Sequence, residues 1–368
     1  MGAKDLFSEP FSNETITKLE IFESYCEAWL PTFIMQNERN LFIYDFFSGM
    51  GYDKNMCPGS PIRILQMILK FQGLILKRGT KINLLFNEYK KKKFQALQKH
   101  VADFITENKT MKAYLNVEFH NEKFEELYPK KVNDLSVGPN LIFIDQNGIK
   151  QFSDSIFKEF LSFERTDFLV FISSSYFKRF AHREEFSRHV NIDTKKIQNS
   201  KYEFIHRTVL EHYKSMIPSK NTTKLYPFSI RKEKNIYGLI FGAKHIAAVD
   251  KFLKIAWKQN NTNGSANFDI DNDEVKESAQ LSFFPAAKRK TKIEKFEEDL
   301  AEYILNSPTT RTNLDVYLYT LQQAFTSEHS APVVRRLKLE NKITYKGQPK
   351  VSYDSYKKNT LVSYIKKS

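Results

Sequence analysis

The segment 41–51 reads Leu-Phe-Ile-Tyr-Asp-Phe-Phe-Ser-Gly-Met-Gly, an apolar run that ends in Asp45 and then in two glycines, Gly49 and Gly51. The run predicts a buried parallel strand that turns sharply into a loop. Glycine has no Cβ and tolerates a positive φ, so a small molecule could lie against this backbone while Asp45 accepts hydrogen bonds from it. By itself, however, the Gly-x-Gly pattern is weak and favours a tight turn beneath an ordinary α/β sheet.

A helix and a second strand are predicted to follow this loop. Ser60 is a natural N-cap, Pro61 suits the first helical position, and the apolar spacing continues the helix to about Lys77. The next apolar run, 82–86, predicts a strand that ends close to Glu88. An acidic residue at the tip of the second strand is the group that holds a ribose in Rossmann-like domains.

Several motifs of this chain resemble, in their order, those of the three-Cys-motif partner protein (TcmP) family, found in bacteria and in mobile or defence-associated loci. They are Trp29, Tyr44-Asp45-x-Phe47-x-Gly49-x-Gly51, Gly59-Ser60-Pro61, Phe143-Ile144-Asp145, 167–171 and 237–245. The resemblance extends over nearly the whole chain, and Gly-Ser-Pro is its most specific piece. Because that family is similar to class I methyltransferases, the resemblance implies an S-adenosylmethionine site and a three-Cys-motif protein as partner.

We therefore expect an α/β fold with a Rossmann-like, class I methyltransferase-type sheet, helices on both faces, and a small C-terminal winged-helix domain. The resemblance implies that S-adenosylmethionine contacts Asp45, Phe47, Gly49, Gly51, Glu88 and Glu122. Asn121 or Glu122 is a candidate by position alone, because a polar residue just past the third strand, predicted at 114–119, meets the adenine in methyltransferase-like folds.

The fourth strand, predicted at 141–144, ends in Asp145-Gln146-Asn147-Gly148. The resemblance implies that Asp145 faces the transfer site, and it is our candidate catalytic residue. In amino-methyltransferases this turn carries prolines and an aromatic residue, but here Gln146 and Asn147 replace them, which removes a rigid turn and a stacking surface for a flipped base. Asp145 could also simply cap the helix that is predicted to start near Ser153.

The rest of the chain divides into three predicted parts. Residues 1–258 form the Rossmann-like domain, with an N-terminal helix at 14–36, a helical insertion near 173–222 and a closing hairpin of strands at 224–230 and 235–241. Residues 259–292 read as a flexible, basic linker, and the basic cluster in this boundary region consists of Lys288, Arg289, Lys290, Lys292 and Lys295. Residues 293–368 form the C-terminal domain.

The C-terminal domain has the winged-helix pattern, with helices at 296–305, 313–324 and 328–340 and a hairpin of strands at 343–346 and 350–353. Its third helix and wing carry five basic candidates for nucleic-acid contacts, namely Arg335, Arg336, Lys338, Lys342 and Lys346. Winged helices also dock proteins. The net charge of +14 and pI of about 9.4 favour nucleic acid, with DNA ahead of RNA.

The sequence also indicates the cellular compartment of the protein. Cys26 and Cys57 are the two cysteines, and neither has the spacing of a metal ligand, so we expect a reducing cytoplasm and no metal. No apolar run is long enough to span a membrane, and the first residues lack the pattern of a signal peptide. We therefore expect a soluble protein without a membrane partner.

Three functions fit these features. The first is an S-adenosylmethionine-binding, methyltransferase-like protein that acts on or at nucleic acid with a three-Cys-motif partner, in a mobile-element or phage-defence locus. The second is a catalytically inactive adaptor or regulator on the same fold, which the altered turn after Asp145 favours. The third is a nuclease with Asp45, Glu88 and Asp145 as metal-binding carboxylates.

Overall fold

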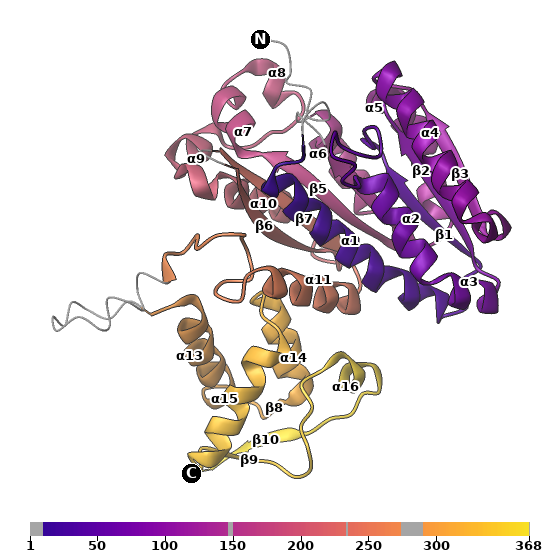
Figure 1. The fold of residues 1–368 in the computed structure, drawn as a ribbon. Helices are drawn as coiled ribbons and strands as arrows, with labels where there is room; N and C mark the ends of the chain where they lie inside the picture. The colour runs from indigo at the N-terminus through magenta and orange to yellow at the C-terminus, as the bar shows by residue number, and fades with distance from the viewer. Residues whose placement is uncertain (1–9, 146–149, 233–234, 274–289, 368) are drawn as a thin grey trace. The chain divides into compact units, whose positions relative to one another are not determined.

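A computed structural model describes residues 10–145, 150–232, 235–273 and 290–367 (Figure 1). The contacts divide the chain into two compact units, residues 1–245 and residues 246–368. The predicted domain boundaries at 258/259 and 292/293 stay predictions. The turn at 146–149 and the cluster residues Lys288 and Arg289 lie outside the described residues.

The N-terminal unit is built on a seven-stranded sheet with the strand order β3-β2-β1-β4-β5-β7-β6. The strands are β1 (Asn40–Asp45), β2 (Lys81–Asn87), β3 (Leu115–His120), β4 (Asn140–Asp145), β5 (Thr166–Ser173), β6 (Lys224–Lys232) and β7 (Asn235–Ala243). Strands β1 to β5 are parallel, whereas β7 is antiparallel to both β5 and β6. The predicted Rossmann-like, class I methyltransferase-type sheet and its closing hairpin are confirmed.

Helices follow most strands and cover both faces of the sheet (Figure 1). They are α1 (Asn13–Ile34), α2 (Ser60–Lys70), α3 (Gln72–Arg78), α4 (Lys91–Glu107), α5 (Phe124–Lys131), α6 (Asp154–Phe160), α7 (Ser174–Phe180), α8 (Glu184–Ser187), α9 (Thr194–Asn199) and α10 (Ile205–Ser215). Short 3-10 turns lie at Lys109–Ala113, Val132–Ser136, Lys150–Phe152 and Tyr202–Phe204. Helices α7 to α10 form the predicted insertion between β5 and β6.

Two aromatic contacts show how the faces are covered. Phe22 of α1 stacks on Phe143 of β4 with ring centroids 4.2 Å apart. Phe124 of α5 packs edge-on against Phe46 at 5.1 Å. Because side chains alternate along a strand and Asp45 is in register with Phe143, Asp45 projects to the α1 face and Phe46 to the α5 face.

The helix predicted to run from Ser60 to Lys77 differs from the prediction in two ways. It is interrupted at Phe71, where α2 ends and α3 begins. Gly59 holds the N-cap position, and Ser60 is the first helical residue. The N-cap prediction for Ser60 is wrong because its hydroxyl instead meets the buried carboxyl group of Asp45, which requires a donor.

The C-terminal unit contains α11 (Ile246–Gln259), α13 (Lys292–Leu305), β8 (Arg311–Thr312), α14 (Asn313–Gln322), α15 (Ser327–Leu339), β9 (Ile343–Thr344), α16 (Tyr353–Lys357) and β10 (Ser363–Lys366). The three strands form a sheet in the order β8-β10-β9. The predicted pairing of the wing is wrong, because β9 pairs with β10 rather than with residues 350–353. That segment enters α16 instead, whose first turn is capped by the hydroxyl of Ser352.

Among the residues placed by the structure, no helix combines the length and the apolar character that crossing a membrane requires.

Candidate cofactor and transfer site

The loop after β1 is shaped by backbone conformations that glycine adopts easily. Gly49 and Gly51 have φ angles of 67° and 94°. The amide of Ser48 donates to the carbonyl of Asn87 at 2.9 Å, and the amide of Gly59 donates to the carbonyl of Gly51 at 2.7 Å. The loop is therefore tied both to the end of β2 and to the start of α2.

Asp53, which sequence reasoning did not single out, organises the second half of this loop. Its buried carboxylate accepts backbone hydrogen bonds from Phe11 at 2.6 Å and from Asn55 and Cys57 at 2.8 Å each. Three N–H donors converging on one carboxylate fix the loop without any ligand. An acid two residues before Asn55 is the turn-forming pattern in the sequence that agrees with this role.

Asp45 lies completely buried beneath the loop. Its Oδ2 accepts a hydrogen bond from Ser60 Oγ at 2.7 Å, and its Oδ1 accepts one from the amide of Phe47 at 3.2 Å. Burial raises the pKa of Asp45 to about 7, and the nearby charge of Asp145 adds to the rise, whereas the two hydrogen bonds oppose it. The carboxyl group thus supports the loop from below, and a direct cofactor contact stays a prediction.

Asp145 forms an ion pair with Lys18 of α1 across the carboxyl end of β4. Lys18 is buried, and its Nζ lies 4.5 Å from the ring centroid of Phe171 on β5. Because Asp145 and Phe171 are in register on adjacent strands, all three groups meet on the α1 face of the sheet. Sequence reasoning missed Lys18, since the helical spacing of α1 gives no hint of a partner 127 residues away.

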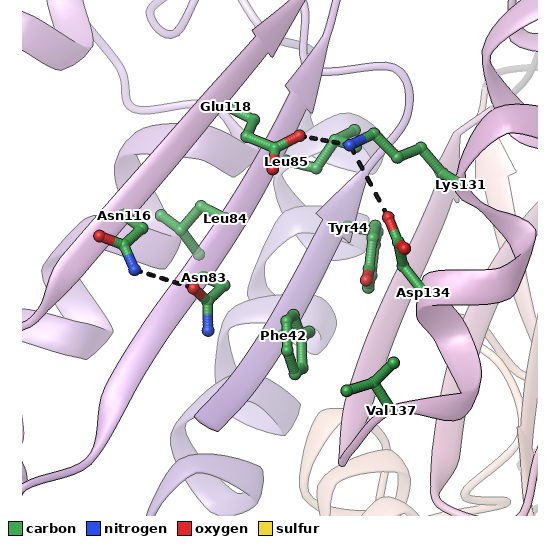
Figure 2. Close-up of a pocket in the computed structure, with 10 residues that line it drawn as sticks. All are labelled: Phe42, Tyr44, Asn83, Leu84, Leu85, Asn116, Glu118, Lys131, Asp134 and Val137. Atoms are coloured by element: carbon green, nitrogen blue, oxygen red, sulfur yellow. Dashed lines mark hydrogen bonds and ion pairs between the residues drawn. The ribbon is translucent and has the colours of Figure 1, made fainter. Parts of the chain in front are cut away.

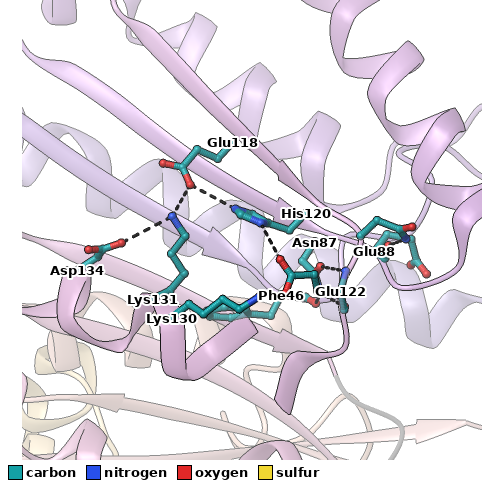
Figure 3. A network of polar contacts seen from close by, with 10 residues as sticks. Phe46, Asn87, Glu88, Glu118, His120, Glu122, Lys130, Lys131 and Asp134 are labelled. Carbon is teal, nitrogen blue, oxygen red and sulfur yellow. Dashed lines mark hydrogen bonds and ion pairs between the residues drawn. The ribbon is translucent and has the colours of Figure 1, made fainter. Parts of the chain in front are cut away.

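Asn87 connects the ends of three strands (Figure 3). Its side-chain amide donates to the carbonyls of Phe46 and Glu122 at 3.1 Å each, and its Oδ1 accepts from the amide of Glu122 at 3.2 Å. Asn87 is buried, so these bonds satisfy its polar atoms while they align the loops after β1, β2 and β3.

The two predicted acids next to Asn87 are more open. Glu88 is half-buried, and its Oε1 accepts from the amide of Lys90 at 2.7 Å. Glu122 pairs with Lys130 and lies 3.5 Å from His120 Nδ1, and the hydrogen bond from Lys130 lowers the pKa of Glu122. Phe47 is also half-exposed, and its ring stacks on Phe124 at 5.6 Å.

A separate cavity of about 210 Å³ opens on the α5 face of the sheet (Figure 2). It is lined by Phe42, Tyr44, Asn83, Leu84, Leu85, Asn116, Glu118, Lys131, Asp134 and Val137. Inside it, Asn116 Nδ2 donates to Asn83 Oδ1 at 2.9 Å, and Lys131 pairs with Glu118 and Asp134. None of the predicted cofactor residues lines this cavity.

Within the described ranges, no group of three or more His, Cys, Asp or Glu side chains has the arrangement to hold a metal ion. Asp45, Glu88 and Asp145 therefore do not converge as the ligand set that the nuclease hypothesis requires.

In the C-terminal unit, the five predicted nucleic-acid contacts are all exposed. Helix α15 buries Val333, Val334 and Leu337, which turns its basic residues toward solvent. Arg336 lies 3.3 Å from Glu297, Lys338 lies 4.0 Å above the ring of Tyr345, and Lys342 pairs with Glu340 at 2.7 Å. Arg335 makes a 3.4 Å bond to the carbonyl of Ala331, and Lys346 is exposed next to β9.

Comparisons with known proteins place the two units in context. Solved structures with similarity to this chain include the O-methyltransferase TomG from Streptomyces achromogenes in complex with SAM, at 11% identity over 61% of this chain and 79% of that chain, with a TM-score of 0.34. An O-methyltransferase from Bacillus cereus in complex with SAH has 16% identity over 61% and 80%, with a TM-score of 0.32. Trm1 from Pyrococcus horikoshii with S-adenosyl-L-methionine has 10% identity over 66% and 59%, with a TM-score of 0.33.

No curated protein sequence matches the chain. Residues 268–350 match the family model of the GMT-like wHTH domain. The C-terminal unit therefore contains a winged helix-turn-helix domain, as its sequence pattern predicted.

Proposed function

We propose that this protein is an S-adenosylmethionine-binding, methyltransferase-like protein that acts on or at nucleic acid. One observation carries the proposal: the ends of four parallel strands bring a glycine loop and three acids to the same edge of the sheet. The loop follows β1, Glu88 follows β2, Glu122 lies just beyond β3, and Asp145 ends β4. Ligands of open α/β sheets bind at this carboxyl edge.

The groups at this edge suit S-adenosylmethionine. Oε2 of Glu88 accepts no hydrogen bond within the described chain, which leaves it available to a ribose hydroxyl. Glu122 and the half-exposed ring of Phe47 would lie along the adenosine, with the backbone of Gly49 and Gly51 against the ligand. When bound, S-adenosylmethionine supplies an electrophilic methyl group, and transfer then asks the protein chiefly for alignment.

The nucleic-acid half of the proposal is supported by the winged helix-turn-helix domain with its exposed cations and by the net charge of +14. DNA is the partner we propose, because an exposed basic helix of this kind fits a major groove. The resemblance of the sequence further suggests a three-Cys-motif protein as partner and a mobile-element or phage-defence locus. Cys26 and Cys57 are both free, which supports a reducing cytoplasm.

The test is calorimetric titration of the full chain with S-adenosylmethionine and S-adenosylhomocysteine. We expect saturable binding that Glu88→Gln weakens and that Glu211→Gln, an exposed acid on α10, leaves unchanged. A melting temperature that rises with ligand concentration would support the same conclusion. Absence of heat and of any thermal shift at high ligand concentration would reject the proposal.

The second candidate function is an adaptor that binds nucleic acid without chemistry. Gln146 and Asn147, in place of the proline and aromatic residue of related enzymes, favour it. An adaptor would retain DNA binding in a gel-shift assay while failing the titration with S-adenosylmethionine.

A further inference from the structure

Lys18 is a buried amine held at the end of β4, where the proposed transfer would take place. Its side chain is 9% exposed, while the side chain of its partner Asp145 is 26% exposed. Lysine is almost never buried without a strong reason, and a buried ion pair rarely adds net stability over an apolar pair. The position of Lys18 therefore calls for a functional explanation.

The surroundings of Nζ are those of an amine-binding site. The ammonium donates to Oδ2 of Asp145 and lies 4.5 Å from the centroid of Phe171, a cation–π contact. Strand β5 lies between β4 and β7, so Phe171 has Asp145 on one side and Tyr237, stacked at 5.1 Å, on the other. An acid and an aromatic face thus hold one primary amine from two directions.

We propose that Lys18 occupies the acceptor position and is itself methylated, so that the acceptor class of this site is a primary alkylamine. The inference rests on the proposed function, because it takes S-adenosylmethionine as the donor. It also explains why the sequence has Gln146 and Asn147 where amino-methyltransferases have prolines and an aromatic residue. An alkylamine acceptor does not need the aromatic stacking surface that a flipped base uses.

Methyl transfer to Lys18 requires that Nζ lose a proton, and Asp145 can accept it. The proton that Nζ loses already points at a carboxylate oxygen of Asp145, which passes it on to water. The freed lone pair of Nζ forms the new N–C bond as the S–C bond to the methyl group breaks. The sulfur keeps the bonding electrons and loses its positive charge. Lysine suits this role because its ammonium gives up a proton more readily than a guanidinium does.

The first experiment is peptide mass spectrometry of the full chain, before and after incubation with S-adenosylmethionine. We expect Lys18 to gain about 14 Da per methyl group, while Lys99, an exposed lysine paired with Asp103, stays unmodified. Asp145→Asn should slow the modification roughly 100- to 10,000-fold, because it removes the proton acceptor but keeps the size of the side chain.

A second readout does not depend on transfer. Lys18 is labelled with an amine-acetylating reagent with and without S-adenosylhomocysteine, and we expect the ligand to protect Lys18 but not Lys99. Binding of S-adenosylhomocysteine without protection or methylation of Lys18 would overturn this inference and leave the proposed function standing. Failure of S-adenosylhomocysteine to bind the folded chain would reject both. Lys18→Arg, which keeps a cation beside Asp145, should abolish the mass shift while the ligand still binds.

Discussion

The hydroxyl of Ser60 donates a hydrogen bond to the buried carboxyl group of Asp45 at 2.7 Å and so ties the start of α2 to the end of β1. A buried acceptor that loses its donor retains its full desolvation cost. We expect Ser60→Ala to lower the free energy of unfolding by about 1–3 kcal/mol in urea denaturation. Ser136→Ala, at an exposed serine, is the control and should change it by less than about 0.5 kcal/mol. Equal effects of the two substitutions would show that the bond to Asp45 adds nothing.

The carboxyl group of Asp45 should make stability depend on pH. Its pKa in the folded chain is about 7, because of burial, whereas the pKa of an unfolded aspartic acid is about 3.9. Between these two pKa values the folded state keeps the proton on Asp45, whereas the unfolded state has lost it. Rising pH therefore lowers the free energy of unfolding across this window, and above about pH 7 the contribution of the protonated carboxyl group is gone.

Asp45→Asn removes this titration and keeps the shape of the side chain. We expect the Tm of the variant, relative to that of the unsubstituted protein, to rise between about pH 4 and pH 7 and to level off at higher pH. Differential scanning calorimetry over this range is the measurement. A Tm difference that is constant with pH would contradict the raised pKa.

Two glycines should respond in opposite ways to substitution by alanine. A Cβ on Gly242 of β7 would lie 2.0 Å from Phe168 Cζ, whereas one on Gly73 of α3 would meet nothing within 4 Å. We expect Gly242→Ala to destabilise the protein by about 1–3 kcal/mol through overpacking. Gly73→Ala should stabilise it by about 0.5–1 kcal/mol, since alanine loses less backbone entropy in a helix. Denaturant titrations of both variants give the change in the free energy of unfolding. A stabilising Gly242→Ala or a destabilising Gly73→Ala would contradict the prediction.

Contacts between the winged helix and phosphates should appear in the salt dependence of DNA binding. Lys346 and Arg335 make no ion pair among the described residues, so substitution of either to Gln removes a cation without freeing an acid. We expect each change to reduce the slope of log K against log salt by about 1. Lys295→Gln, at an exposed residue of α13, is the matched control. Fluorescence anisotropy at several salt concentrations gives the slopes. If Lys295→Gln reduces the slope as much as the other two substitutions do, the effect comes from the net charge of the protein and not from phosphate contacts of Arg335 and Lys346.

The strand ends were predictable because they depend on local patterns. The apolar run before Asp45 and the one before Asp145 each predicted a buried strand, and both strands end at the acid. Positive φ angles at Gly49 and Gly51 agree with the conformational freedom that the sequence suggested. The basic face of α15 was predictable in the same way. With 3.6 residues per turn, Val333 and Leu337 lie on one face of the helix and the arginines lie on another.

The sequence by itself determined the sheet and the edge at which its acids gather, since strand and helix periodicity are encoded by neighbouring residues. Only the tertiary structure decided what those acids meet. The partner of Asp45 turned out to be Ser60, Asp145 turned out to pair with Lys18, and β9 turned out to pair with β10. These choices depend on which buried groups need partners once distant segments pack together, and sequence spacing carries no record of that demand.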